Sequence, residues 1–203
     1  HSFSRRQRQM CIRDRSDTMS FSGSGDLDNG WSVTFSHAID GGINDSNSIA
    51  IDMGDMGKLT FAGLGGSGPV AANDDKMPSA NEESWANAAG TKTAAASGAS
   101  GNNGFNYTLP AMVDGVSMEV YYLPSTAGTT SSFEYGLTYT GIDNLTVGYA
   151  GGDNETTATA TIESTNLWAT YTLDSFTVGI QDNETDSETA SADTEFRAYG
   201  ISY

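Results

Sequence analysis

The stretch FEYGLTYTGIDNLTVGY, residues 133–149, decides the fold. Its first half places apolar side chains at every second position: Phe133, Tyr135, Leu137 and Tyr139. After residues 141–144, which include Gly, Asp and Asn, the alternation resumes: Leu145, Val147 and Tyr149. A period of two residues predicts a strand with one apolar and one polar face, and the intervening residues favour a tight turn. The stretch therefore predicts an antiparallel hairpin.

The same alternation begins at Met19 and recurs as far as Tyr203, so that eleven strands are predicted. Apolar residues occupy every second position at 31–35, 49–53, 59–61, 105–109, 116–122, 133–139, 145–149, 167–173, 176–180 and 199–203. Part of the pattern repeats after about 32 residues, the length of one hairpin. No helical period competes with it.

The predicted connections fall into two kinds. Tight turns are rich in Gly, Asp and Asn, whereas five longer polar stretches read as loops: 40–47, 63–104, 124–131, 151–161 and 181–194. Short turns at one end and long loops at the other are typical of a transmembrane β-barrel. We therefore predict an all-β, antiparallel up-and-down transmembrane β-barrel. Because eleven is odd and bacterial single-chain barrels have even strand numbers, we expect the barrel to be incomplete.

The charge balance is acidic, with 26 Asp and Glu against nine Lys and Arg and a net charge of −17. No basic surface is available to neutralise phosphates, which argues against nucleic acid as a partner. The single cysteine excludes an internal disulfide and a cysteine-based zinc site.

Five of the nine basic residues and Cys11 lie within the first 15 positions. Residues 5–15 resemble translated sequencing-adapter read-through; the alternative is a basic targeting or membrane-surface arm, without the apolar core of a secretory signal. We therefore predict a non-native or disordered arm at 1–18 and the β domain at 19–203. Beyond residue 15 there remain 25 acidic and four basic side chains.

Three features carry a resemblance to a known family. They are the hairpin SIAIDMGDMGKLTFA at 48–62, the segment NYTLP at 106–110 followed by Asp114-Gly115, and the Thr-Val-Gly-Tyr strand at 146–149. Together they resemble general diffusion porins of Gram-negative bacteria, especially of the alphaproteobacterial type.

The resemblance implies a sixteen-stranded barrel that forms a homotrimer in outer-membrane lipid and passes small hydrophilic solutes by passive diffusion, without enzymatic activity. It also implies that the long segment 63–104 folds inward and narrows the pore. The chain would then span the second to the twelfth strand of such a barrel.

If the apolar face meets lipid, the polar face lines the lumen with Asp26, Asp52, Lys58, Glu119 and Glu134. The long segment adds Asp74, Asp75, Glu82 and Glu83, opposed by Lys76 and Lys92. Because charged rings in a pore select ions by sign, this set predicts a preference for cations. The alternative is that the carboxylates only keep loops solvated. Porins of this family usually oppose the acidic loop with an arginine cluster, which this sequence does not show.

Trp168 falls on the polar face, so that it either lines the lumen or marks a local error in the predicted register.

Two predicted loops share the sequence Asp-Asn-Glu-Thr, at 153–156 and 182–185. Closely placed carboxylate and amide oxygens suit calcium, with Asp153, Glu155, Asp182 and Glu184 as candidate ligands. Neither stretch has EF-hand spacing, and solvated loop tips are the alternative. No other cofactor is predicted.

Two further alternatives belong to other classes of protein. One is a secreted or surface acidic β protein, an adhesin or a calcium-stabilised solenoid, which should show short repeats of equal length. The other is a carbohydrate hydrolase, which requires two converging carboxylates. Nothing in the sequence singles out such a pair, and the glycine-rich stretch 63–68 lacks the lysine of a phosphate-binding loop. No enzymatic activity is therefore predicted.

Overall fold

The computed structural model describes residues 18–78, 98–125, 130–157, 160–188 and 193–203. The predicted arm at 1–18, apart from Thr18, lies outside the described residues.

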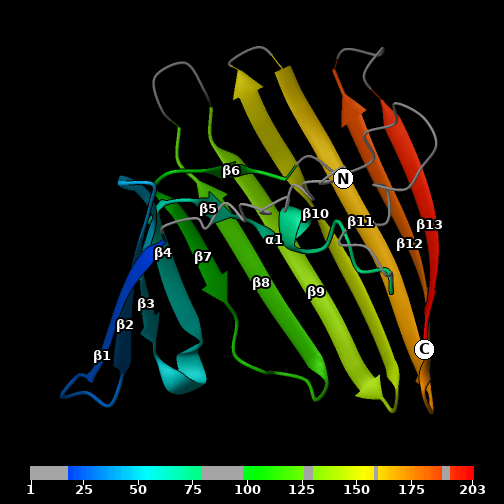
Figure 1. Cartoon of the computed structure of the whole chain (residues 1–203), viewed down its shortest axis with the longest axis horizontal. Helices are drawn as coiled ribbons and strands as arrows, with labels where there is room; N and C mark the ends of the chain where they lie inside the picture. Colours follow the sequence, from blue (N-terminus) through cyan, green and yellow to red (C-terminus); the bar gives the residue numbers. More distant parts are fainter. Residues whose placement is uncertain (1–17, 79–97, 126–129, 158–159, 189–192) are drawn as a thin grey trace, which may run out of the picture.

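An eleven-stranded antiparallel sheet forms the body of the molecule, and each strand pairs with its neighbours in chain order (Figure 1). The strands are β1 (Met19–Asp26), β2 (Ser32–Asp40), β3 (Ile43–Asp52), β4 (Lys58–Leu64), β7 (Gly104–Thr108), β8 (Val116–Leu123), β9 (Ser132–Ile142), β10 (Leu145–Thr157), β11 (Ala160–Leu173), β12 (Phe176–Ser187) and β13 (Thr194–Ser202). This order confirms the eleven predicted strands and the up-and-down topology. A meander of adjacent hairpins is not a solenoid, so the solenoid form of the alternative is wrong. β1 and β13 are the two edges, and the sheet is not closed.

Burial in this sheet is the reverse of that in a water-soluble protein. In β9, Phe133, Tyr135 and Leu137 are exposed, whereas Ser132, Glu134 and Gly136, which alternate with them, are buried. Large apolar side chains are likewise exposed on one face of most other strands, including Phe35, Ile49, Phe105, Tyr122, Leu167, Val178, Ile180 and Ile201. An apolar face of this extent is stable against hydrocarbon rather than water. Within the sheet, paired strands satisfy each other's backbone groups, and only the outer edges of β1 and β13 have no neighbouring strand.

Three of the predicted long loops are instead continuations of strands. β2 and β3 are joined by Gly41 and Gly42 alone, both at positive φ, so that 40–47 is a tight turn flanked by strands. β10 and β11 extend through most of 151–161, and β12 continues to Ser187 within 181–194. The prediction failed because a backbone ladder pairs regardless of side chains, and where both faces are polar no alternation marks the strand. β8 ends at Leu123 and β9 begins at Ser132, in agreement with a connection between the two strands at the predicted place.

The described part of the segment between β4 and β7, residues 65–78 and 98–103, lies over the polar face, about midway between the two ends of the sheet (Figure 1). It contains β5 (Gly66–Ser67), the short helix α1 (Pro69–Ala72) and β6 (Ser100–Gly101), and β5 pairs with β6. α1 contacts β8, β9, β10 and β11. We call residues 65–78 and 98–102 the inward segment. A short 3-10 helix, η1 (Gly54–Met56), forms the turn between β3 and β4.

No helix among the described residues has the length and apolar character needed to cross a membrane.

Candidate functional site: the inward segment and the polar face

Glu134 anchors both parts of the inward segment. Its side chain projects from the polar face of β9 and is 1% exposed. One carboxylate oxygen accepts a hydrogen bond from the backbone N–H of Val70 at 2.9 Å, and the other accepts one from the N–H of Ala99. These partners stabilise a carboxylate that would otherwise be costly to bury. Glu134 thus lies on the predicted face, but it is covered by the segment and does not face an open lumen.

A cluster of amide side chains binds the next part of the segment. Gln181 and Asn183 of β12 both donate to the carbonyl oxygen of Asp74, at 2.6 and 2.8 Å. The Oε1 of Gln181 accepts from the backbone N–H of Lys76 at 2.8 Å. In β11, Asn166 donates to the carbonyl oxygen of Val70 at 2.6 Å. Side chains from two strands therefore satisfy backbone groups of a segment that has little secondary structure of its own.

None of these amide side chains was predicted from the sequence as a site residue. Gln181 and Asn183 lie in a stretch that reads as a loop, and a lone polar residue such as Asn166 on a polar face carries no distinguishing signal. Their spacing of two, at 181 and 183, is the pattern of neighbouring residues on one face of a strand. That spacing alone could have indicated a shared partner.

Trp168 lies on the polar face, beneath the inward segment. Its ring is 7% exposed and packs with Met77 and Ala198. Its Nε1–H donates to Oδ1 of Asn73 at 2.8 Å. The Nζ of Lys76 lies 5.9 Å from the ring centroid, within the range of a cation–π contact. The predicted register is therefore correct at Trp168.

Glycines on the wall allow the segment to approach the backbone closely. A Cβ at Gly136 would lie 2.8 Å from Cβ of Pro69, and one at Gly179 would lie 2.7 Å from Cδ of Pro78. A Cβ at Gly200 would lie 2.5 Å from the carbonyl oxygen of Pro78. Because all three distances are below normal contact, these positions are matched to the segment that covers them.

The other predicted lumen charges form one row across the sheet. Strand pairing places residues opposite one another in the order Asp26, Ser32, Asp52, Lys58, Thr108 and Glu119. Asp52 accepts a hydrogen bond from the N–H of Gly54 at 2.9 Å. In the described part of the chain, neither Lys58 nor Glu119 forms an ion pair. The row therefore holds four charged residues, Asp26, Asp52, Lys58 and Glu119. The first and the last of them are 93 positions apart in the sequence.

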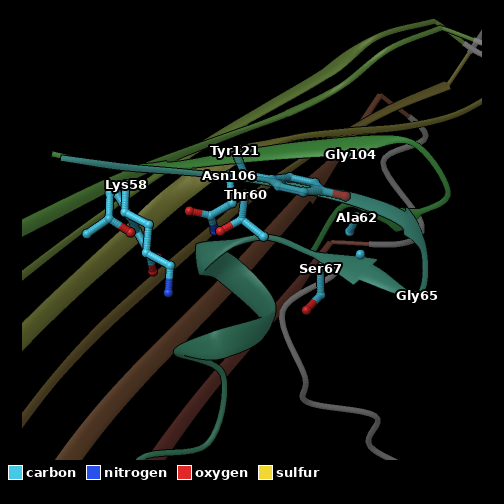
Figure 2. A pocket seen from close by; sticks show the side chains of 11 residues that line it. Lys58, Thr60, Ala62, Gly65, Ser67, Gly104, Asn106 and Tyr121 are labelled. Atoms are coloured by element: carbon cyan, nitrogen blue, oxygen red, sulfur yellow. The ribbon is translucent and has the colours of Figure 1, made fainter. Parts of the chain in front are cut away.

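A pocket of about 320 Å³ opens between this row and β5 (Figure 2). Lys58 and Thr60 of β4, Asn106 of β7 and Ser67 of β5 line it with polar atoms. Tyr121 of β8 forms part of its wall, and its buried hydroxyl finds no partner among the described residues.

Of the charges predicted on the long segment, only some lie within the described residues. Asp74 and Asp75 lie half-buried at the end of the segment, and Lys76 beside them is exposed. Glu82, Glu83 and Lys92 lie outside the described residues.

The candidate calcium ligands lie on strands, not at loop tips. Asp153 is on β10 and opposite Glu163 of β11, whereas Asp182 and Glu184 are on β12, with β11 between. Asp182 is paired with Arg197 of β13, whose Nε donates to it at 2.9 Å. The side chain of Glu155 lies outside the described part of the structure. Among the side chains that are described, no three acidic, histidine or cysteine groups lie together as metal ligands would. A calcium site here stays a prediction.

Comparison with known proteins identifies a family and several structures of similar fold. A family model described as Gram-negative porin matches residues 6–203. An anion-selective porin from Comamonas acidovorans superimposes with a TM-score of 0.59 at 14% sequence identity, over 91% of this chain and 62% of that one. Two substituted variants of the porin from Rh. blastica give TM-scores of 0.43 and 0.44 at 13% identity, over 92% of this chain and 79% of theirs. A search of curated proteins gave no significant match. At these identities the structural likeness shows the fold alone.

Proposed function

This chain belongs to the Gram-negative porin family, and from that premise we propose that it forms the wall of a water-filled channel for passive diffusion of small hydrophilic solutes. It is an outer-membrane protein of a Gram-negative bacterium, of a family of channels rather than enzymes. The chain spans 62% of the length of the Comamonas porin, so the activity of the whole protein is part of this proposal.

The observation that carries the proposal is the reversed burial together with the inward segment. One face of the sheet is apolar and exposed, as lipid contact requires. The opposite face is polar, and a segment anchored by Glu134, Asn166 and Gln181 lies across it midway along the strands. A segment held there by its backbone supports a role as a fixed constriction that sorts solutes by size.

We further propose that the channel prefers cations. The described row on the polar face holds Asp26, Asp52 and Glu119 against Lys58, and the segment adds Asp74 and Asp75 against Lys76. Glu134 is not counted, because it is covered. The Comamonas porin is described as anion-selective, but selectivity follows the side chains of the pore rather than the fold.

Two partner proposals accompany the channel. The exposed apolar side chains of the outer face support contact with outer-membrane lipid. A homotrimer is proposed from family membership, and chemical cross-linking in detergent would test it by yielding a three-chain species.

Planar-bilayer recording of the full-length gene product tests the channel. Stepwise conductance increments are the expected result. In a KCl gradient, the reversal potential should have the sign expected when potassium permeates more readily than chloride. An absence of conductance from correctly folded protein would overturn the channel proposal. Conductance with an anion-selective reversal potential would overturn only the proposed charge preference.

A further inference from the structure

The pocket beside β5 combines features that a plain channel wall does not need. It lies where β5 of the inward segment faces the wall strands β4, β7 and β8, and it therefore borders the narrowed part of the proposed channel (Figure 2). Its volume of about 320 Å³ is large enough for a solute of several heavy atoms.

Two opposite charges flank the pocket without neutralising each other. Lys58 and Glu119 each lie directly opposite Thr108, one on either side of it. Two strand spacings separate their backbones by roughly 10 Å. Both line the pocket on the polar face, and neither forms an ion pair with a described side chain. An ammonium and a carboxylate thus remain available to a solute that enters between them.

This charge arrangement discriminates among solutes. A small anion attracted to Lys58 is opposed by Glu119 and by Asp52, which lies opposite Lys58 on β3. A small cation attracted to Glu119 is opposed by Lys58. A solute that carries one charge of each sign satisfies both groups at once, with charge-assisted hydrogen bonds at each end. Electrostatic complementarity of this kind selects by the direction of a dipole rather than by net charge.

The groups between the two charges suit the middle of such a solute. Thr108 lies between the charges, and Thr60, Asn106 and Ser67 add hydroxyl and amide groups to the lining. In Figure 2, Lys58, Thr60 and Asn106 lie side by side on the wall, and Ser67 projects from β5. These groups can donate to or accept from hydroxyl and amide substituents.

We propose that this pocket is a transient binding site for small zwitterions of the amino-acid class, with the solute carboxylate directed at Lys58 and its ammonium at Glu119. The inference rests on the proposed channel function and names a solute class that the channel retains briefly. Occupancy is weak, because a site in a diffusion channel must release its solute as readily as it admits it.

Single-channel recording of the full-length protein tests the proposal. The probes are γ-aminobutyrate and glycine as zwitterions and glycerol as a neutral solute, added at increasing concentration in 0.1 M KCl, where screening extends over about 10 Å. We expect a saturable reduction of conductance by the zwitterions, beyond that given by glycerol. In 1 M KCl, where screening acts within about 3 Å, the difference should fall several-fold.

Substitutions locate the effect. Lys58→Gln and Glu119→Gln should each raise the half-saturating zwitterion concentration at least fivefold. Lys76→Gln is the matched control, since Lys76 is also an exposed lysine near the polar face but does not line the pocket, and it should leave the zwitterion effect unchanged. The double variant Lys58→Glu with Glu119→Lys keeps both charges in reversed order and should recover much of the effect.

The outcomes separate the two proposals. Wild-type conductance that zwitterions and glycerol reduce equally, or a zwitterion effect that survives both single substitutions, overturns the binding site and leaves the channel intact. A wild-type protein without conductance overturns the channel. If a single variant fails to fold, binding by the double variant decides the question: the zwitterion effect supports the site, and its absence in a conducting double variant overturns it.

Discussion

The polar face has two halves that differ in what lies against them. Over β8 to β13 the inward segment covers the face, and side chains such as Glu134, Asn166 and Gln181 are almost fully buried. Over β1 to β4 the same face is largely open, and every residue of β1 is exposed. We call these the covered half and the open half.

Two carboxylates on neighbouring strands show what the difference means. Glu134 and Glu119 have the same chemistry and lie on the same face, yet Glu134 accepts two backbone hydrogen bonds from the segment while Glu119 lines a pocket. A residue's place on the face follows from its position in the strand. Its role follows from whether the inward segment reaches it.

The largest expected effect comes from removing the anchor of the covered half. Glu134→Ala leaves two buried N–H groups without partners, and we expect it to destabilise the folded protein by about 3 kcal/mol, since each hydrogen bond to a charged group contributes roughly 1.5–3 kcal/mol. Urea unfolding in detergent micelles measures the change. Single-channel conductance should rise as the segment loosens.

Glu119→Gln provides the comparison at a half-buried position on β8 that accepts no hydrogen bond from the described part of the segment, and it should change stability by less than about 0.5 kcal/mol. Equal losses in both variants would contradict the distinction between a carboxylate that binds the segment and one that lines the pocket.

A second effect concerns the close approach of the wall to the segment. Gly136→Val places side-chain atoms against Pro69, and overpacking of this kind costs about 1–3 kcal/mol. Gly23→Val on β1 is the matched change, because a Cβ at Gly23 meets nothing within 4 Å. Thermal unfolding monitored by circular dichroism should separate the two variants; a similar melting temperature for both would show that the segment does not press on Gly136.

A smaller effect is expected at Trp168. Trp168→Phe removes the hydrogen bond to Asn73 and should cost about 1 kcal/mol. Tryptophan fluorescence gives an independent check, because loss of a buried indole should shift the remaining emission to longer wavelength. Trp31→Phe, at a half-buried site in the apolar alternation that begins just before β2, should shift the emission the other way. If neither substitution moves the emission, Trp168 is not covered by the segment.

The smallest effect is expected at Tyr121. Because its buried hydroxyl has no partner among the described residues, Tyr121→Phe should be neutral or stabilising by up to about 1 kcal/mol. Chemical denaturation distinguishes this from the loss that breaking a satisfied hydrogen bond would give. A loss of more than 1 kcal/mol would mean that the hydroxyl is hydrogen-bonded in solution.

Much of the open half could be predicted from the sequence, whereas the covered half could not. The alternation at 31–35 and 49–53 placed Asp52 on the polar face, where the structure has it. Glu134 was assigned to the correct face by the same rule, but its burial depends on Val70 and Ala99, which lie 64 and 35 positions away. The loops at 40–47, 151–161 and 181–194 were predicted too long because the strand ends there are polar on both faces and carry no periodic signal.

By itself, the sequence determined the number of strands, their up-and-down order and the face on which each side chain of the alternating stretches stands. It could do so because the two-residue period of a strand is a local property of the backbone. Only the tertiary structure decided which polar side chains meet the inward segment and which form the row from Asp26 to Glu119. Both depend on contacts between residues that are distant in the sequence. Strand register aligns the row. The inward segment packs against glycines and amide side chains of the sheet, and its hydrogen bonds join residues up to 109 positions apart.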